Sequence, residues 1–226
     1  MYSAGFYPYP DEESYWGYWS KQAILGGIDL DVTPLHKTFL SMLSGKKIFV
    51  LSTNADGQFV KAGLPEDQIF CTQGDYFHIQ CGKGCHDKLY DAVDMFRQMD
   101  QARRDCRIPT YMVPKCPVCG GAMDMNLRKD QHFVQDAAWY DAEQRFGDFL
   151  SEAEKGRLVL LELGVGFNTP MIIRFPFEKL VRENKNISII RLNLNEAVVS
   201  ESLGDRAVGI NADMKESIMD MEGSRN

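Results

Sequence analysis

The feature that most constrains the fold of this chain is an alternation of short apolar runs with segments of helical periodicity. A continuous apolar run is typical of a strand that is covered on both faces, and such runs separated by helices indicate a parallel sheet. The sequence therefore predicts an α/β fold with helices on both faces of the sheet. The expected strands lie at 48–51, 69–71, 158–163, 187–192 and 207–210, and the expected helices at 11–25, 35–43, 140–154, 177–183 and 214–221.

The alternation breaks between about 81 and 127, where four cysteines occur as two close pairs. Cys81 and Cys85 form the first pair, and Cys116 and Cys119 form the second, with glycines inside or directly after each pair. Glycine permits the tight turns that point backbone amides at thiolates. We call each cysteine pair with its turn a knuckle. Four sulfurs on two knuckles suit a closed tetrahedral Zn²⁺ site, which would be structural and would hold a small insert together.

Three other interpretations of these cysteines stay open at this point. The four thiols could be free and buried, or Cys116 and Cys119 could form a redox-active pair, although no strand leads straight into a helix there. His86 could replace one of the ligands because it adjoins Cys85. Cys71 and Cys106 belong to no pair, so we interpret them as free thiols.

Charge and composition narrow the classes of function. The formal net charge of −7 argues against a nucleic-acid-binding protein, which would need a basic surface. The apolar runs are too short to cross a membrane, and no secretory leader is apparent. We therefore expect a cytoplasmic protein whose cysteines serve as metal ligands and free thiols rather than as disulfides.

Small and amide-bearing residues follow four of the expected strands, at 52–56, 72–75, 164–170 and 193–195. Ligands of a doubly wound sheet bind outside the carboxyl ends of its strands. Turn formation alone also favours Gly, Asn and Asp, so no single segment is decisive. The agreement of the four segments predicts a crevice for a polar ligand that carries phosphates and riboses.

Taken together, these motifs resemble the sirtuins, a family of NAD-dependent protein deacylases and ADP-ribosyltransferases. The resemblance implies a Rossmann-like domain with a small inserted zinc module, and the four cysteines match the zinc ligands of the family in order. We expect a single sirtuin-type domain over 1–226, with Rossmann-like parts at about 28–80 and 129–226 and the zinc module at about 81–128.

The resemblance also implies which residues would bind NAD. Ser52-Thr53-Asn54-Ala55-Asp56 is similar to the family segment whose Asn and Asp lie in the nicotinamide pocket. The segment that begins at Gly164 and the Asn after the next strand resemble the parts that contact the adenosine side. The implied cofactor-binding residues are Phe6, Thr53, Asn54, Asp56, Gln73, Gly164, Gly166, Asn168, Thr169 and Asn193, of which Asn54, Asp56 and Gln73 would be catalytic.

The chain departs from the deacylases at Gln73-Gly74, where that group has a His-Gly pair whose His is the general base. An amide can orient a ribose hydroxyl but cannot take its proton near neutral pH. The segment TQGDY and the segment GVGFNTP look most like the macrodomain-linked class M sirtuins. That class implies protein mono-ADP-ribosylation with a lipoyl-bearing carrier protein as target. His78 is a weaker candidate for the base.

A second departure concerns the start of the chain. Sirtuins open with a strand and a Gly-Ala-Gly-x-Ser loop, whereas MYSAGFYPYP resembles the flexible cofactor-binding loop that follows them. We therefore expect an N-terminally truncated sequence. The first prediction is an NAD-dependent protein mono-ADP-ribosyltransferase that uses NAD and zinc, acts on a protein substrate such as a lipoylated carrier, and has a macrodomain protein as a further partner. The alternatives are a protein lysine deacylase and an inactive zinc-stabilised module with a vestigial crevice.

Overall fold

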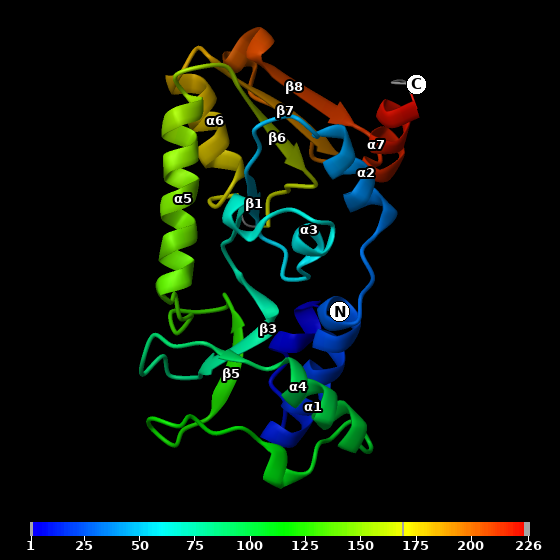
Figure 1. Cartoon of the computed structure of the whole chain (residues 1–226), viewed down its shortest axis with the longest axis vertical. Coiled ribbons are helices and arrows are strands. Elements are labelled where there is room, and N and C mark those ends of the chain that lie inside the picture. The colour runs from blue at the N-terminus through cyan, green and yellow to red at the C-terminus, as the bar shows by residue number, and fades with distance from the viewer. Residues whose placement is uncertain (1, 169, 224–226) are drawn as a thin grey trace. The chain divides into compact units, whose positions relative to one another are not determined.

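The computed structural model describes residues 2–168 and 170–223, which divide into two compact units. Unit 1 comprises Met1–Thr33 and Val50–Gln144, and unit 2 comprises Pro34–Phe49 and Arg145–Asn226. Both units contain β-sheets and helices (Figure 1).

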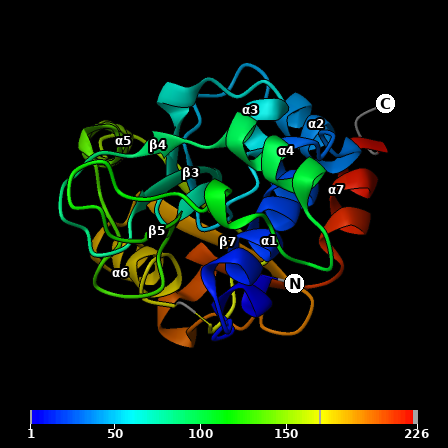
Figure 2. The ribbon, with the colours of Figure 1, turned by 90° about the horizontal axis from the view of Figure 1, so that it is seen from below.

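The helical part of unit 1 consists of η1 (Tyr2–Phe6), α1 (Glu12–Ala23), the π-helical turn η2 (Ile24–Ile28) and α4 (Val93–Ala102). Asp11 caps the start of helix α1, and its side chain accepts a hydrogen bond from the backbone N–H of Ser14 at 2.8 Å. Trp16 of α1 packs against α4, where its ring stacks on that of Phe96 with centroids 6.2 Å apart. Figure 2 shows the two helices next to each other, and both rings are fully buried.

A pair of parallel strands in unit 1, β1 (Val50–Ser52) and β2 (Ile69–Cys71), forms the first sheet. The short helices α3 (Gln58–Lys61) and η3 (Glu66–Gln68) connect them. Ser52 pairs with Cys71, so both strands end at the same edge. The loops that follow Ser52 and Cys71 are therefore neighbours, and they carry Asn54 and Gln73.

The second sheet of unit 1 is antiparallel, in the order β4 (Tyr90–Asp91), β3 (Gly74–Cys81) and β5 (Met123–Leu127). The apolar alternation did not predict these strands, because their sequences mix polar and apolar residues and their pairing does not need a helical crossover. A short helix, η4 (Thr110–Met112), lies between α4 and β5 in the chain. Strand β3 ends at Cys81, so the first cysteine pair begins at the last residue of β3.

Unit 2 contains a parallel sheet in the order β6 (Leu158–Leu163), β7 (Ile187–Asn193) and β8 (Ala207–Asn211). Its helices are α2 (Pro34–Met42), α6 (Arg174–Glu183), η5 (Glu201–Arg206), α7 (Met214–Gly223) and the second half of α5 (Ala137–Ala153), whose first half belongs to unit 1. Helix α6 packs on β7, with Phe177 and Val181 buried beside Ile187 and Ile189. Burial of such side chains contributes roughly 1.5–3 kcal/mol each to stability.

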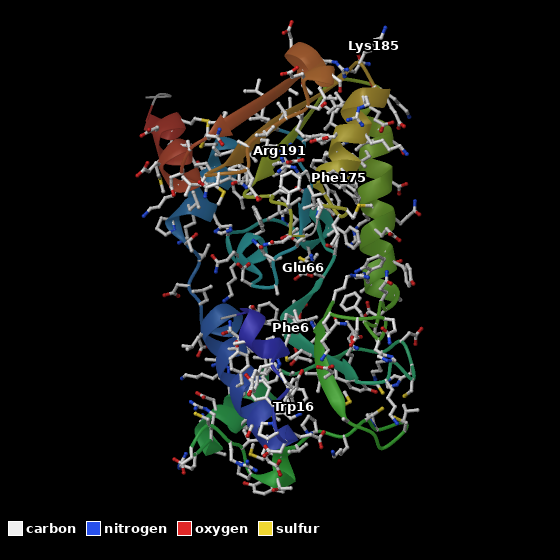
Figure 3. All side chains as sticks on the ribbon, turned by 180° about the vertical axis from the view of Figure 1, so that it is seen from behind. Phe6, Trp16, Glu66, Phe175, Lys185 and Arg191 are labelled. Carbon is white, nitrogen blue, oxygen red and sulfur yellow. The ribbon has the colours of Figure 1, made fainter. Side chains whose placement is uncertain are left out.

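Two charged residues lie inside the sheet of unit 2, where the strands are otherwise apolar. Glu162 of β6 and Arg191 of β7 are paired in register and are almost completely buried. Arg191 Nη2 donates to Glu162 Oε1 at 3.1 Å, and Arg191 Nη1 donates to Glu178 of α6 at 2.9 Å. Figure 3 labels Arg191 among the side chains of this unit. Such pairing offsets part of the cost of removing the two charges from water.

All five expected strands are present, but among the described residues they form two parallel sheets, one in each unit, rather than one. Strand β1 starts at Val50, later than expected, while α5 and α6 start earlier, at Ala137 and Arg174. The helix expected at 11–25 ends in the π-helical turn. None of the described helices combines the length and the hydropathy that a bilayer crossing requires.

Candidate functional site

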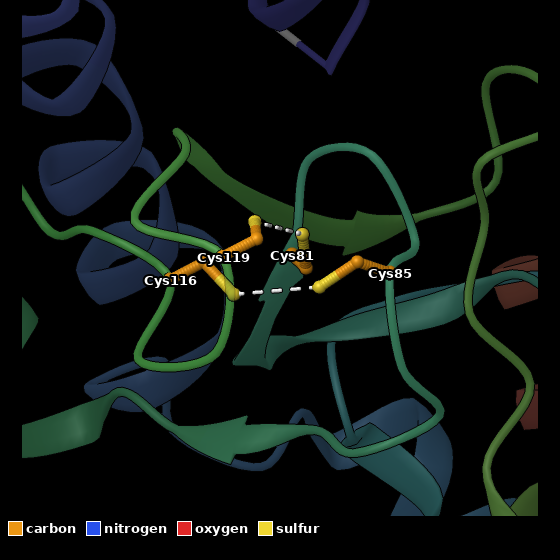
Figure 4. Close-up of side chains that lie close together, drawn as sticks. All are labelled: Cys81, Cys85, Cys116 and Cys119. Carbon is orange, nitrogen blue, oxygen red and sulfur yellow. Dashed lines mark hydrogen bonds between the residues drawn. The ribbon is translucent and has the colours of Figure 1, made fainter.

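The four cysteines of the expected zinc module come together in unit 1 (Figure 4). Their Sγ atoms all lie within 4.8 Å of one another. The Sγ atoms of Cys81 and Cys119 are 3.7 Å apart, and so are those of Cys85 and Cys116. A tetrahedral Zn²⁺ site with Zn–S distances of about 2.3 Å has S···S edges of about 3.8 Å. The sulfur spacing therefore fits zinc.

Both knuckles are built by glycine in the left-handed region. Gly84 has φ +57° and its N–H donates to the carbonyl of Cys81 at 2.9 Å. Gly120 has φ +68° and its N–H donates to the carbonyl of Cys116 at 2.8 Å. A side chain would strain these turns. The glycines within and after the cysteine pairs thus explain how two short segments present four sulfurs to one point.

The close spacing of the four thiols favours a bound cation. Burial alone would raise the pKa of the Cys81 thiol, but hydrogen bonds from the backbone N–H groups of Cys85 and Lys83 bring that pKa down to about 6. The backbone N–H of Cys119 likewise lowers the pKa of Cys116. Burial and the neighbouring cysteines raise the pKa of Cys85 to about 12. Four thiolates at this spacing repel one another, so a bound cation is what would allow all four to ionise.

The geometry does not favour the other interpretations of the cysteines. The close sulfur contacts join one pair to the other, whereas a redox-active Cys116–Cys119 couple would need its own two sulfurs adjacent. His86 lies beside the cluster, with Nδ1 3.1 Å from Cys85 Sγ and Nε2 2.9 Å from the hydroxyl of Tyr90. Its ring is an outer neighbour of the sulfurs, which already number the four ligands that zinc takes.

The edge of the parallel pair in unit 1 brings the residues implied for the nicotinamide side close together. The loop after β1 and the start of β3 are tied by a hydrogen bond from the N–H of Tyr76 to the carbonyl of Ala55 at 3.0 Å. Asn54 is exposed, and Asp56 and Gln73 are half-buried. Within the described residues, the side-chain amides of Asn54 and Gln73 have no hydrogen-bond partner. They are therefore available to a ligand.

Acidic groups surround this edge. Burial, followed by the charges of Asp75 and Asp56, raises the pKa of the Cys71 thiol to about 12. Cys71 ends β2, so both carboxylates must lie near the carboxyl end of that strand. The neutral thiol, as expected for an unpaired cysteine, contributes no charge to the site. Two carboxylates, those of Asp56 and Asp75, are thus close enough to this edge to act on Cys71.

Arg128 is a residue of this edge that sequence analysis missed. Its backbone N–H donates to the carbonyl of Gln73 at 3.0 Å, and its Nε donates to the carbonyl of Thr72 at 3.3 Å. The guanidinium lies over the ring of Phe133, 4.3 Å from the centroid, and burial lowers its pKa. Arg128 directly follows β5, so only knowledge of the antiparallel sheet could have placed it beside Gln73.

His78, the weaker candidate for a base, already has a carboxylate partner. Its Nδ1 lies 2.9 Å from Asp75 Oδ2. This hydrogen bond raises the pKa of His78 in spite of the opposing effect of burial. A raised pKa keeps the ring protonated at pH values where a general base must be neutral, so the geometry does not favour that role.

The residues implied for the adenosine side lie in unit 2, at the carboxyl ends of β6 and β7. Gly164 follows β6 with φ +67°, and Asn193 ends β7. Asn193 Nδ2 donates to the carbonyl of Val165 at 3.2 Å, so the two loops meet. A Cβ on Gly166 would lie 2.3 Å from Oε2 of Glu196, the movable end of a side chain. Asn168 is exposed in the same loop.

Three implied residues stand apart from these sets. Thr169 lies outside the described residues. Phe6 packs edge-on against Trp19 of α1, with ring centroids 6.2 Å apart. Thr53 is half-buried in the loop after β1, one residue before Asn54.

A polar cavity of about 280 Å³ lies beside the first knuckle. It is lined by Lys83, Gly84, His86 and Asp87 and by residues 131–135. None of the implied cofactor residues that the structure describes lines this cavity. It is thus separate from the edge that carries Asn54 and Gln73.

No family model matches the chain, but two curated proteins and many solved structures do. A protein ADP-ribosyltransferase of Staphylococcus aureus is 31% identical over 215 residues, which cover 95% of this chain and 68% of that protein. A probable bifunctional ADP-ribose hydrolase/ADP-ribosyltransferase of Fusarium oxysporum is 34% identical over 88% of this chain, but over only 35% of its own length.

Sirtuins are among the solved structures with similar folds. One, from work on the structural basis of sirtuin substrate affinity, has a TM-score of 0.62 and 16% identity, and covers 99% of this chain and 80% of its own. Another, Sir2 bound to an acetylated peptide, has a TM-score of 0.61 and 15% identity over 94% of this chain and 78% of its own. At this level of identity the likeness concerns the fold.

Proposed function

The chain belongs to the protein ADP-ribosyltransferase family with the sirtuin fold, and from that membership we propose that it transfers ADP-ribose from NAD to a protein substrate. The observation that carries the proposal is the 31% identity to the staphylococcal transferase over 95% of this chain. The amide at Gln73, where the sirtuin deacylases carry a basic His, supports transfer over deacylation.

Two observations support the fit of these residues to NAD. Asn54 and Gln73 offer side-chain amides that have no partner among the described residues, and amides suit both the carboxamide and the ribose hydroxyls of NAD. Gly164 and Gly166 keep backbone free of side chains at the end of β6, where a pyrophosphate needs close approach. When bound, NAD supplies the ribose carbon that a protein nucleophile attacks as nicotinamide leaves.

We assign the roles on the nicotinamide side as follows. Asn54 and Asp56 hold the carboxamide, and Gln73 orients ribose hydroxyls without taking a proton. The carboxylates of Asp56 and Asp75, whose charges reach Cys71, favour the positive character that develops on the ribose. Arg128 fixes the backbone of Gln73 through its N–H. Phe6 and Thr53 border this part of the cofactor.

On the adenosine side, we assign the phosphates and ribose to the two loops of unit 2. Gly164, Gly166, Asn168 and Thr169 supply the first loop, and Asn193 supplies the second. Asn193 Oδ1 accepts from the N–H groups of Asn195 and Glu196 at 3.0 Å, which fixes the turn after β7. A fixed turn costs less entropy when the ligand binds.

Zinc has a structural role in this proposal. Cys81, Cys85, Cys116 and Cys119 would fill its four positions and leave none for substrate. We further propose that residues 1–226 act as one sirtuin-type domain, with the zinc module at about 81–128. The finer proposals are a lipoylated carrier protein as the target, a macrodomain protein as a second partner, and a cytoplasmic location.

The proposal is tested by incubating the chain with labelled NAD and with either the lipoylated or the unlipoylated carrier. We expect label on the lipoylated carrier, with release of free nicotinamide. A Gln73→His variant should bind NAD nearly as well as the unaltered chain. Any gain in its rate of deacetylation of an acetylated peptide would measure how much deacetylase activity the absence of a base at position 73 removes. Robust deacetylation by the unaltered chain, with no label on any protein, would contradict the proposal and favour a deacylase.

A further inference from the structure

Arg174, the first residue of α6, donates three hydrogen bonds to backbone carbonyls of unit 2. Its Nη1 donates to Val165 at 3.2 Å and to Glu196 at 2.9 Å, and its Nη2 donates to Val198 at 2.8 Å. Val165 lies in the loop after β6, and Glu196 and Val198 lie in the loop after β7. One side chain therefore bridges the two loops.

The guanidinium of Arg174 is closed off from water. The residue is only 2% exposed, and the ring of Phe167 covers the guanidinium face, with its centroid 4.0 Å from Cζ. Phe167 itself is 53% exposed, so the ring is a cap between a buried cation and solvent. Burial and then the charge of Arg191 lower the pKa of Arg174, but an arginine stays protonated throughout the physiological range.

Arg174 is not the partner of the buried carboxylates nearby. Arg191 takes those, through Glu162 and Glu178. Hydrogen bonds to carbonyls satisfy the donors of Arg174 but return less Coulomb energy than a carboxylate would. Packing alone does not require a buried guanidinium, such as that of Arg174, to bind only the carbonyls of loops.

We infer that Arg174, capped by Phe167, is a positioning residue that holds the two loops of unit 2 in the shape that binds the adenosine half of NAD. The inference rests on the proposed function, because Gly164, Gly166 and Asn193 are the residues that these loops carry. Without the bridge, the loops would keep their sequence and their glycines but would sample more conformations. The cost would then fall on cofactor affinity rather than on the reacting atoms.

The test uses ADP-ribose as the probe and isothermal titration as the readout. The unaltered chain is measured first: absence of ADP-ribose and NAD binding there would overturn the proposed function itself. If it binds, Arg174→Lys, which keeps the charge and loses the planar fork, should weaken ADP-ribose binding by about tenfold or more. Arg182→Lys, an exposed position on the same helix, is the matched control and should bind as the unaltered chain does.

Two further readouts separate positioning from mere stability. Hydrogen exchange without ligand should speed up in residues 164–168 and 194–198 of Arg174→Lys while β7 keeps its protection. The KM for NAD should rise while kcat changes little, because the nicotinamide side is untouched. Unchanged ADP-ribose affinity, or a fall in kcat at constant KM, would overturn the inference.

A second variant decides the matter if Arg174→Lys does not fold. Phe167→Leu keeps an apolar cover and removes the ring from an exposed position, so the fold should survive. We expect a several-fold loss of ADP-ribose affinity with faster exchange in the same two loops. Affinity equal to that of the unaltered chain would overturn the role of the Arg174–Phe167 pair.

Discussion

Gly74 is the residue whose backbone leaves least room for change. It has φ +80°, and a Cβ there would lie 1.8 Å from the carbonyl oxygen of Asn126 on the neighbouring strand β5. We expect Gly74→Ala to reduce the free energy of unfolding by about 2 kcal/mol or more, measured by denaturant titration. Gly63→Ala is the control, since Gly63 has φ +100° but nothing within 4 Å of a Cβ.

The control isolates the clash from the backbone conformation. Gly63→Ala should cost about 1 kcal/mol, the cost of a positive φ alone. Equal losses of unfolding free energy in the two variants would show that contact with β5 is not the reason why position 74, next to Gln73, requires glycine. The difference between the variants therefore measures how tightly the candidate site is built at that turn.

The pair His78 and Asp75 gives the chain a pH dependence with a definite sign. The hydrogen bond with Asp75 raises the pKa of His78 in the folded chain above the unfolded value of about 6.5. Its stabilisation is therefore complete below about pH 6.5 and is lost as the pH rises through the folded pKa. Because the pair is partly exposed to solvent, the effect should stay below about 1 kcal/mol.

This dependence is measured by denaturant titration between about pH 5 and pH 9. Asp75→Asn keeps an acceptor for the backbone N–H groups of Phe77 and His78 but removes the charge. The stability of this variant should fall less with rising pH than that of the unaltered chain. Asp67→Asn, at an exposed position in η3, should leave the slope unchanged. An identical slope in all three proteins would contradict the role of the pair.

At the scale of elements, the sulfur cluster ties β3 to the segment before β5. We expect one zinc per chain by elemental analysis, lost in Cys116→Ser and on chelation. Hydrogen exchange should then speed up in β3, β4 and β5, while β6, β7 and β8 keep their protection. Cys106→Ser, at an exposed cysteine outside the cluster, should retain both metal and protection. Loss of the metal without faster exchange would contradict a structural role.

The elements show how far sequence reasoning reaches. The strands at 158–163 and 187–192 are long apolar runs, and β6 and β7 lie where those runs predict them. Strand β3 was missed because Gly74–Cys81 has no apolar run, and its alternation with polar residues suits an antiparallel sheet. The cysteine pairs, in contrast, were enough to predict the cluster, because ligand spacing is a local property of the sequence.

At the scale of the whole molecule, the residues implied for NAD occur in both units. Asn54, Asp56 and Gln73 belong to unit 1, and Gly164 and Asn193 belong to unit 2. A ligand that binds only the folded chain stabilises it by about 2.7 kcal/mol at a hundred times its Kd. We expect ADP-ribose to raise Tm with concentration, and nicotinamide alone to raise it less. No shift with ADP-ribose at saturating concentration would contradict the cofactor assignment.

The site was harder to predict than the fold. Asn54 and Asn193 could be named because they follow apolar strands and match segments of the sirtuins, and their role in binding NAD stays a prediction. Arg128 and Arg174 could not be named, because nothing in the sequence distinguishes an arginine that bonds to backbone carbonyls from one that points to solvent. Their roles depend on carbonyls from loops that are distant in the chain, and only the folded backbone shows those contacts.

The pairing of sulfurs across the two knuckles has a consequence for a chain that has lost its metal. Cys81 lies closest to Cys119, and Cys85 closest to Cys116. An added oxidant that withdraws two electrons for each bond would therefore form two disulfides, Cys81–Cys119 and Cys85–Cys116. Each of them would link one knuckle covalently to the other. Peptide mapping of aged, demetallated protein should find those two disulfides. Such oxidation would preserve the path of the backbone, but zinc could not bind again until a reductant restored the thiols.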